Sequence, residues 1–352
     1  MDTTLSRNFG SDNLAPVCSP VMAAINAVNT GLVPSYGADE SSERLQAAMS
    51  ALFEREVAIY PVATGTAANA LALAQLAPPF GAIYCHEGAH IVTDECGAPE
   101  LFTGGAKLLG LPSSTGKIGP AAIDAAVALA TDMGVHHVKP SAISVTQATE
   151  LGTVYGLDEL KALSAAGKRH GLGVHMDGAR FANALVHLDC SPAEATWKAG
   201  IDVLSFGATK NGALAAEAVV FFDPRYAQDF ERRRKRAGHL WSKQRYLSCQ
   251  LLAYLQDDVW LHNARQANDM AARLAQGIET LAGARLLQPV QANELFVAVP
   301  ERLIAALESE GFHFYRWPWL KPADGTAIRL VTSYVTTRAD VDDFVQSASR
   351  MR

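Results

Sequence analysis

The sequence predicts an α/β protein with two parts, a large domain with a mostly parallel sheet between helices and a smaller C-terminal α+β domain. Short β-rich runs alternate with alanine- and leucine-rich helical runs over about two thirds of the chain, which is typical of a parallel sheet covered on both faces. From about residue 246 the pattern changes to a long helical stretch followed by shorter strands. The length of 352 residues also exceeds one small core. We therefore expect an N-terminal arm and large domain over residues 1–246 and a small domain over 247–352.

The elements of the large domain follow one another along the chain. Apolar runs rich in β-branched and aromatic residues predict strands over 57–62, 81–86, 141–147, 173–177, 203–206 and 218–222. Runs of helix-forming residues between them predict helices over 66–77, 121–133 and 157–171. In such sheets ligands bind outside the carboxyl ends of the strands. Residues that follow a strand are therefore the first candidates for a site.

The C-terminal part has a different pattern. One long helix is expected over 247–282, then strands over 293–300 and 327–334 with a helix over 302–311 between them. The long helix is expected to join the two domains.

Charge and cysteine content narrow the class of protein. The chain has 30 basic and 36 acidic residues, a net charge of −6, which gives no general attraction to nucleic acid or to an anionic membrane. Small metabolites are the expected partners. The five cysteines are well separated and never form C-x-x-C, which favours neither disulfides nor a zinc knuckle and fits a reducing cytoplasm. The first residues show no export signal, and no segment has the roughly 20 apolar residues of a membrane span.

Lys210 follows a predicted strand and stands among small residues in "SFGATKNGALAAEAVVFF". A lysine kept partly neutral beside the core can form a Schiff base. The alternative is a surface loop lysine with small neighbours.

The stretch "VATGTAANA" places Thr64, Gly65 and Thr66 between a strand and a helix. Free backbone N–H groups at a helix start form a natural cup for a phosphate. The same residues also serve as plain turn and N-cap residues.

Asp177 ends an apolar strand in "GVHMDGARFANA", where a buried carboxylate needs a cation or donor. Its partner is either Arg180, in a structural ion pair, or a protonated ring nitrogen that the carboxylate keeps charged. Cup, carboxylate and lysine come in the order that would hold the phosphate, the ring nitrogen and the aldehyde of pyridoxal 5'-phosphate.

Five segments carry a family resemblance: "RNFGSDN", "TGTAAN", "HMDGAR", "SFGATKNGA" and "IRLVTSYVTT". Together they span residues 7–337 and resemble the L-threonine aldolase family of fold-type-I, aspartate-aminotransferase-like pyridoxal-phosphate enzymes, most of all its low-specificity members. The resemblance implies cleavage of L-threonine, L-allo-threonine and related β-hydroxy-α-amino acids to glycine and an aldehyde. It also implies a homodimer or homotetramer with active sites at the subunit interface.

The resemblance assigns roles residue by residue. Lys210 would carry the cofactor, Asp177 would pair with its ring nitrogen, Gly65 and Thr66 would hold its phosphate, and His90 would stack on its ring. The substrate carboxylate would meet Ser11, Arg180 and Arg329, with Arg180 also beside the cofactor. A guanidinium suits this task because it binds a carboxylate through two parallel hydrogen bonds. For Arg329 a structural salt bridge is the alternative. His90 is also the first candidate for the base that takes the proton of the β-hydroxyl.

One departure from the family pattern concerns the catalytic base. Many members read Asn-Thr-His after the strand, where this chain has Ala148, Thr149 and Glu150. Glu150 either takes the place of a second active-site histidine or is an ordinary surface residue. The preference between threonine and allo-threonine stays open for the same reason.

Two further motifs resemble known functional patterns, but we do not expect them to have those functions. "HEGAH" matches the zinc-protease pattern H-E-x-x-H, but it follows a strand directly and contains Gly88, so no metal site is expected. The basic run 231–245 is expected to be a solvated helix face or a subunit contact. By resemblance, Arg234, Lys235, Arg236 or Lys243 would reach the cofactor phosphate of a neighbouring subunit.

Two rival functions remain beside the aldolase. Another lyase or an aminotransferase on the same scaffold would use the same cofactor residues. A protein that binds the cofactor without turnover would need no site for a substrate carboxylate, so Arg180 and Arg329 speak against it.

Overall fold

The computed structural model describes residues 7–350, and its centre is a seven-stranded sheet. The strands are β1 (Ala58–Val62), β2 (Gly81–His86), β3 (Lys107–Leu111), β4 (Lys139–Thr146), β5 (Gly173–Gly178), β6 (Val203–Gly207) and β7 (Glu217–Phe221). They lie in the order β1-β7-β6-β5-β4-β2-β3. The pairs from β3 to β6 are parallel, and β7 runs antiparallel to both of its neighbours. The predicted α/β class with a mostly parallel sheet is confirmed.

Both faces of this sheet are covered, as the near-continuous apolar strands require. Along β2, Ile83 and Cys85 pack with the α3 side, whereas Ala82 and Tyr84 pack with the opposite core. This alternation is the two-residue period of a strand. The alanine- and leucine-rich sequence of α3 lets that helix lie close on the sheet, and most of its residues are buried.

The helices of the large domain connect these strands. They are α1 (Ser19–Ala27), α2 (Glu40–Leu52), α3 (Gly65–Leu76), α4 (His90–Thr93), α5 (Ala98–Thr103), α6 (Pro120–Asp132), α7 (Leu157–Arg169), α8 (Phe181–Leu188), α9 (Phe230–Arg236) and α10 (Arg245–Leu255). Helix α10 packs against α1 and α2.

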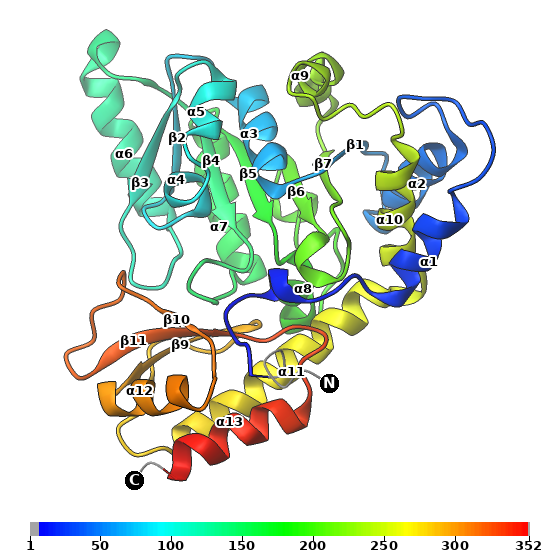
Figure 1. The fold of residues 1–352 in the computed structure, drawn as a ribbon. Helices are drawn as coiled ribbons and strands as arrows, with labels where there is room; N and C mark the ends of the chain where they lie inside the picture. Colours follow the sequence, from blue (N-terminus) through cyan, green and yellow to red (C-terminus); the bar gives the residue numbers. More distant parts are fainter. Residues whose placement is uncertain (1–6, 351–352) are drawn as a thin grey trace.

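A second, antiparallel sheet of four strands builds the small domain. Its strands are β8 (Arg285–Leu286), β9 (Glu294–Val299), β10 (Tyr315–Arg316) and β11 (Thr326–Val331), in the order β10-β11-β9-β8. The helices α12 (Glu301–Ser309) and α13 (Arg338–Arg350) belong to this part, and α11 (Val259–Glu279) contributes to the cores of both parts. Figure 1 shows α11 running from the large domain into the small one.

The N-terminal arm attaches to the small domain before it enters the large one. Asn8 pairs with His313, and the N–H of Val331 donates to the carbonyl of Phe9. Phe9 is buried in the small-domain core. The arm, dark blue in Figure 1, then passes α8 on its way to α1. It therefore ties together residues that are far apart in sequence.

The helix expected over 247–282 is wrong in one respect, since it is two helices with a break between them. Asp257 and Asp258 have positive φ values of 50° and 54°, which end α10 and start α11 in a new direction. The expected domain division at residue 246 falls at the start of α10. The two hydrophobic cores share α11, because Ala264 packs in the large core and Met270 in the small one.

Within residues 7–350, no helix is both long and apolar enough to cross a membrane. Residues 1–6, part of the segment searched for an export signal, lie outside the described residues.

Candidate active site

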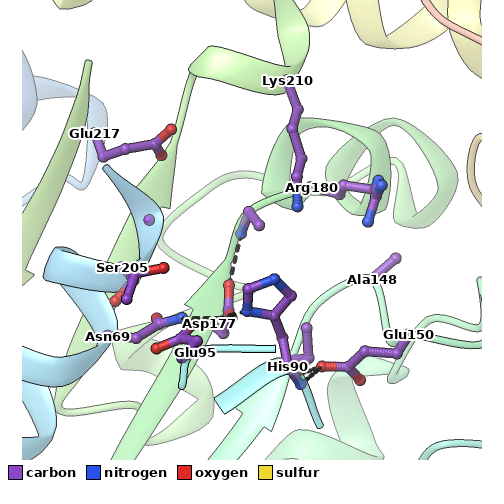
Figure 2. A pocket seen from close by; sticks show the side chains of 14 residues that line it. Asn69, His90, Glu95, Ala148, Glu150, Asp177, Arg180, Ser205, Lys210 and Glu217 are labelled. Atoms are coloured by element: carbon purple, nitrogen blue, oxygen red, sulfur yellow. Dashed lines mark hydrogen bonds and ion pairs between the residues drawn. The ribbon is translucent and has the colours of Figure 1, made fainter. Parts of the chain in front are cut away.

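A pocket lies at the carboxyl ends of β4, β5 and β6, beside the start of α3. It holds about 500 Å³ of space that protein atoms leave free, part of it open to solvent. Six of the eight residues predicted for the site line it: Gly65, Thr66, His90, Asp177, Arg180 and Lys210. Figure 2 shows the side chains of His90, Asp177, Arg180 and Lys210 converging from separate elements. Ser11 and Arg329 lie outside this lining.

Lys210 sits on a single 3-10 turn, Thr209–Asn211, that directly follows β6. The backbone at Gly207 lies close to that of Ala179, since a Cβ on Gly207 would lie 2.6 Å from the Ala179 carbonyl oxygen. Only glycine allows this contact, which brings the end of β6 against the end of β5. The Asn211 amide then fixes the turn by donating to the Tyr254 hydroxyl and the Trp260 carbonyl.

A carboxyl group that the sequence analysis missed holds the start of this turn. Glu217, at the beginning of β7, accepts hydrogen bonds from the N–H groups of Ala208 and Thr209, both at 3.2 Å. Burial raises the pKa of Glu217 to about 7. A charged residue opening the buried apolar run "EAVVFF" was the available signal, because such a carboxylate needs donors.

The start of α3 presents a helix N-terminus to the pocket. The Thr64 hydroxyl caps the helix by accepting the Ala67 N–H at 3.2 Å. The N–H groups of Gly65 and Thr66, in the first turn, have no acceptor within the helix. A Cβ on Gly65 would meet nothing within 4 Å, so the backbone there is open to a bound group. The arrangement suits an anion.

Asp177 is buried, and hydrogen-bond donors hold both of its oxygens. The Ala179 N–H donates to Oδ1 at 2.9 Å, and the Asn69 amide donates to Oδ2 at 2.7 Å. The alternative in which Asp177 pairs with Arg180 is wrong, since the Arg180 guanidinium contacts two other carboxylates. Asp177 is thus a buried hydrogen-bond acceptor at the pocket wall. Among residues 7–350, no cationic side chain forms an ion pair with it.

His90 begins α4 and is held at two points by carboxyl groups. Its ring Nδ1 lies 2.9 Å from Oε1 of Glu95. Its backbone N–H donates to Oε1 of Glu150 at 2.8 Å. In Figure 2, Glu95 and Glu150 approach His90 from opposite sides. The hydrogen bond with Glu95 raises the pKa of His90, while burial opposes it.

The reading of Glu150 as an ordinary surface residue is wrong. Its carboxyl group is buried, and the hydroxyl of Thr146 also donates to Oε1 at 2.7 Å. Oε2 is buried without a hydrogen-bond partner. Burial raises the pKa of Glu150 to about 7, although the two hydrogen bonds favour its charged form. Glu150 therefore supports the backbone of His90 from the pocket wall.

Arg180 and Arg329 belong to one buried cluster of alternating charge. Arg180 donates to Asp12 through Nε at 2.8 Å and Nη2 at 3.0 Å, and its Nη1 lies 3.1 Å from Glu294. Burial disfavours the charged guanidinium, but the charges of Asp12 and Glu294 outweigh it and keep the pKa of Arg180 above its ordinary value. Arg329 lies 3.7 Å from the other oxygen of Glu294. Asp12 and Glu294 were not among the residues predicted for the site.

The positive charge of Arg329 has fewer and longer contacts with carboxylates than that of Arg180. One nitrogen donates to the carbonyl of Gly10 at 3.1 Å, and Nε is buried without an acceptor. The guanidinium lies over the rings of Trp317 and Tyr315, 4.6 and 5.3 Å from their centroids. Burial lowers the pKa of Arg329. Ser11 precedes this cluster, and its hydroxyl accepts the N–H of Asn13 at 3.2 Å.

The residues in the pocket suit the chemistry of pyridoxal phosphate. An amine, a helix N-terminus, a buried carboxylate and a half-buried imidazole are the groups that its aldehyde, phosphate, ring nitrogen and ring require. The open backbone at Gly65 provides space for the phosphate, and the buried carboxylate of Asp177, with one hydrogen bond at each oxygen, can still accept a further donor.

The "HEGAH" motif and the basic run lie at separate places in the fold. His86 ends β2 and contacts the Ser113 carbonyl, whereas His90 begins α4, so the two histidines do not share a helix face. No cluster of metal-ligating side chains occurs among residues 7–350. In the basic run, Arg234 is buried and donates to the Pro61 carbonyl, which removes it from the exposed face of α9.

Comparison with known proteins finds a matching lyase family and relatives described as threonine aldolases. A family profile described as beta-eliminating lyase matches residues 8–302. A low specificity L-threonine aldolase from a Pseudomonas species is 45% identical over 313 residues, which cover 89% of this chain and 90% of the relative. The enzyme of the same description from Pseudomonas aeruginosa has the same identity and coverage.

The solved structure of Leishmania major threonine aldolase superimposes with a TM-score of 0.91 and 29% sequence identity. The match covers 97% of this chain and 98% of that one. Both domains of the fold are therefore shared with that enzyme.

Proposed function

This chain belongs to the beta-eliminating lyase family, among the L-threonine aldolases, and we propose that it cleaves L-threonine, L-allo-threonine and related β-hydroxy-α-amino acids. The products are glycine and an aldehyde. The observation that carries the proposal is the convergence of Lys210, Asp177, His90 and the start of α3 on one pocket. Like its relatives, the enzyme depends on pyridoxal phosphate.

Bound pyridoxal phosphate supplies an electron sink for the negative charge left at Cα when the Cα–Cβ bond breaks. The Lys210 amine would hold the cofactor's aldehyde carbon, and the Gly65 and Thr66 N–H groups would hold its phosphate. Asp177 would keep the ring nitrogen protonated, because a buried carboxylate stabilises a positive charge beside it. His90 would lie against the ring.

The substrate carboxylate binds at the cluster of Arg180 and Arg329, with Ser11 beside it. Arg180 donates two hydrogen bonds to Asp12 and pairs with Glu294 through Nη1, whereas the buried Nε of Arg329 has no acceptor. Arg329 is therefore the stronger candidate for a direct bond to the substrate. Fixing the carboxylate sets the torsion about Cα, so that the bond to be broken stands in the reactive orientation.

His90 takes the proton of the β-hydroxyl as the Cα–Cβ bond breaks. Its ring is partly exposed in the pocket, which lets a substrate oxygen approach. A histidine is suited to this transfer because its pKa lies near the operating pH.

Active sites at an interface between identical subunits complete the proposal. Exposed apolar side chains occur at Leu32, Val33, Tyr36, Leu214 and Trp241. The N–H of Tyr36 donates to the carbonyl of Ser242, so two of these segments lie side by side. Lys235, Arg236 and Lys243 are the basic residues that remain to reach a partner's phosphate.

All five cysteines are free, which supports a cytoplasmic location.

The test uses purified enzyme with L-threonine, L-allo-threonine and L-phenylserine, with and without a 2-oxo acid. We expect glycine from each substrate at the same rate whether or not the 2-oxo acid is present. Glycine release that depends on the 2-oxo acid would support an aminotransferase instead.

A further inference from the structure

We propose that Glu95 is a positioning residue that fixes the ring of His90 with Nδ1–H toward Glu95 and leaves Nε2 as the atom that takes the substrate proton. This inference rests on the proposed function, in which His90 is the base. Neither the sequence motifs nor the family resemblance assigned a role to Glu95.

The geometry around Glu95 supports this role. Its side chain is fully buried, whereas that of His90 is 40% exposed. Oε1 lies 2.9 Å from Nδ1 of His90. An ionised carboxylate only accepts hydrogen bonds, so Nδ1 carries the proton. In neutral imidazole the lone pair is then on Nε2.

A second contact keeps Glu95 in place and favours its ionised form, against the burial that raises the pKa of Glu95. The Asn69 amide donates to Oε1 of Glu95 at 2.8 Å and to Oδ2 of Asp177 at 2.7 Å. The two carboxylates thus share one amide group, which uses both of its hydrogens as donors. Glu95 is linked through Asn69 to the carboxylate that is proposed to face the ring nitrogen.

The charges around His90 come from four elements. Glu95 follows α4, Asp177 lies at the end of β5, and Lys210 follows β6. Glu150 follows β4 and contacts His90 only at its backbone N–H. The hydrogen bond with Glu95 is the largest influence on the imidazole and favours its protonated form, as does the charge of Asp177, while burial and Lys210 oppose it. Removing Glu95 therefore weakens His90 as a base.

The proton transfer balances without a further reactant. The O–H bond of the β-hydroxyl breaks and an N–H bond forms at Nε2. The electron pair of the O–H bond becomes the second C–O bond of the aldehyde, and the pair of the Cα–Cβ bond stays on Cα. The imidazolium formed at His90 then faces the carboxylate of Glu95, which stabilises it.

The first test reads the tautomer of His90 in the unmodified holoenzyme. Histidine labelled with ¹⁵N and ¹³C in the holoenzyme reports which ring nitrogen carries the proton, and His90→Asn identifies the signal among the ten histidines. We expect neutral His90 to carry its proton on Nδ1. A proton on Nε2 would overturn the proposal.

The second test compares Glu95→Gln with Glu150→Gln, the same chemical change at the two carboxyl groups that hold His90. Glu95→Gln should lower the titration midpoint of His90 by about one pH unit and move the acidic limb of kcat/KM by the same amount. Glu150→Gln should leave the His90 midpoint in place, because Glu150 contacts the backbone. Equal shifts in both variants, or no shift in Glu95→Gln, would contradict the role.

These readouts separate this inference from the proposed function. A midpoint that shifts without any change in the acidic limb would mean that His90 is not the base, and would overturn the inference. Absence of threonine cleavage in the unmodified enzyme would overturn the proposed function, while the tautomer of His90 would still decide whether Glu95 orients the ring.

Discussion

Arg180 binds Asp12 through two hydrogen bonds, from Nε at 2.8 Å and from Nη2 at 3.0 Å. The arm residue Asp12 thereby occupies the donor fork that a substrate carboxylate would otherwise use. The two arginines of the cluster consequently differ. Arg180 binds two protein carboxylates, Asp12 and Glu294, whereas Arg329 has a buried Nε without an acceptor.

Arg329→Lys should therefore lower kcat/KM for amino acids by roughly 10- to 100-fold while cofactor binding stays intact. Lysine keeps the charge but loses the planar fork. Arg180→Lys is the matched comparison, and it should also lower the melting temperature because Asp12 and Glu294 lose their fixed partner. Steady-state kinetics and thermal melts separate the two effects. An unchanged kcat/KM in Arg329→Lys would leave that arginine with a structural role only.

Asp177→Asn should lower kcat by about 10²- to 10⁴-fold with the cofactor still bound, since the change removes the charge that is proposed to keep the ring nitrogen protonated while nearly preserving the shape. Visible absorbance of the dialysed protein measures cofactor retention, and single-turnover kinetics measure the chemical step. Turnover at the unmodified rate would rule out the electron-sink role of Asp177.

The fold could be predicted from the sequence because its strands are short, apolar and separated by helix-forming runs. The edge strand β3 was missed, since "KLLGL" is partly exposed and lacks a strong pattern. The break between α10 and α11 was missed because both helices contribute to buried cores, and two aspartates with positive φ interrupt a pattern that otherwise reads as continuous.

The site was predictable where a residue follows a strand, as Asp177 and Lys210 do. The buried carboxyl groups of Glu95, Glu217 and Glu294 were not recognised. Glu217 and Glu294 open apolar strands, which is a readable sign of a paired charge. Glu95 lies in a short connection whose path depends on tertiary contacts, so its approach to His90 could not be read from local sequence.

Both threonine diastereomers should be cleaved, because no second histidine is present at Glu150 to distinguish the β-carbon configurations. We expect kcat/KM values within about 100-fold of each other, or ~2.7 kcal/mol. Glu150→His should slow both substrates, because it removes the acceptor of the His90 N–H, and should widen their ratio. Cleavage of one diastereomer only would argue against low specificity.

Glu150→Gln should change how stability depends on pH. Burial raises the pKa of Glu150 to about 7 in the folded protein, from an ordinary value of 4.5. The folded protein binds the proton of Glu150 more tightly than the unfolded chain does, which stabilises the fold. This stabilisation is fully present below about pH 4.5 and is lost as the pH rises through about 7.

Between pH 5 and pH 8 the unmodified enzyme should therefore lose about 1–3 kcal/mol that Glu150→Gln does not lose. Melting temperatures of both proteins at equal concentration measure this difference. Glu56→Gln, a change at an exposed residue, should follow the unmodified enzyme. Identical pH dependence in Glu150→Gln would mean that Glu150 is not held in its neutral form.

All of these roles depend on the attachment of the cofactor to Lys210. Borohydride reduction of the purified holoenzyme fixes the cofactor to whichever lysine holds its aldehyde, and peptide mass spectrometry identifies that residue. We predict modification of the peptide that contains Lys210, and loss of the cofactor from Lys210→Ala on dialysis. Modification of another lysine, or the same visible absorbance and reducible linkage in Lys210→Ala, would contradict the proposed active site.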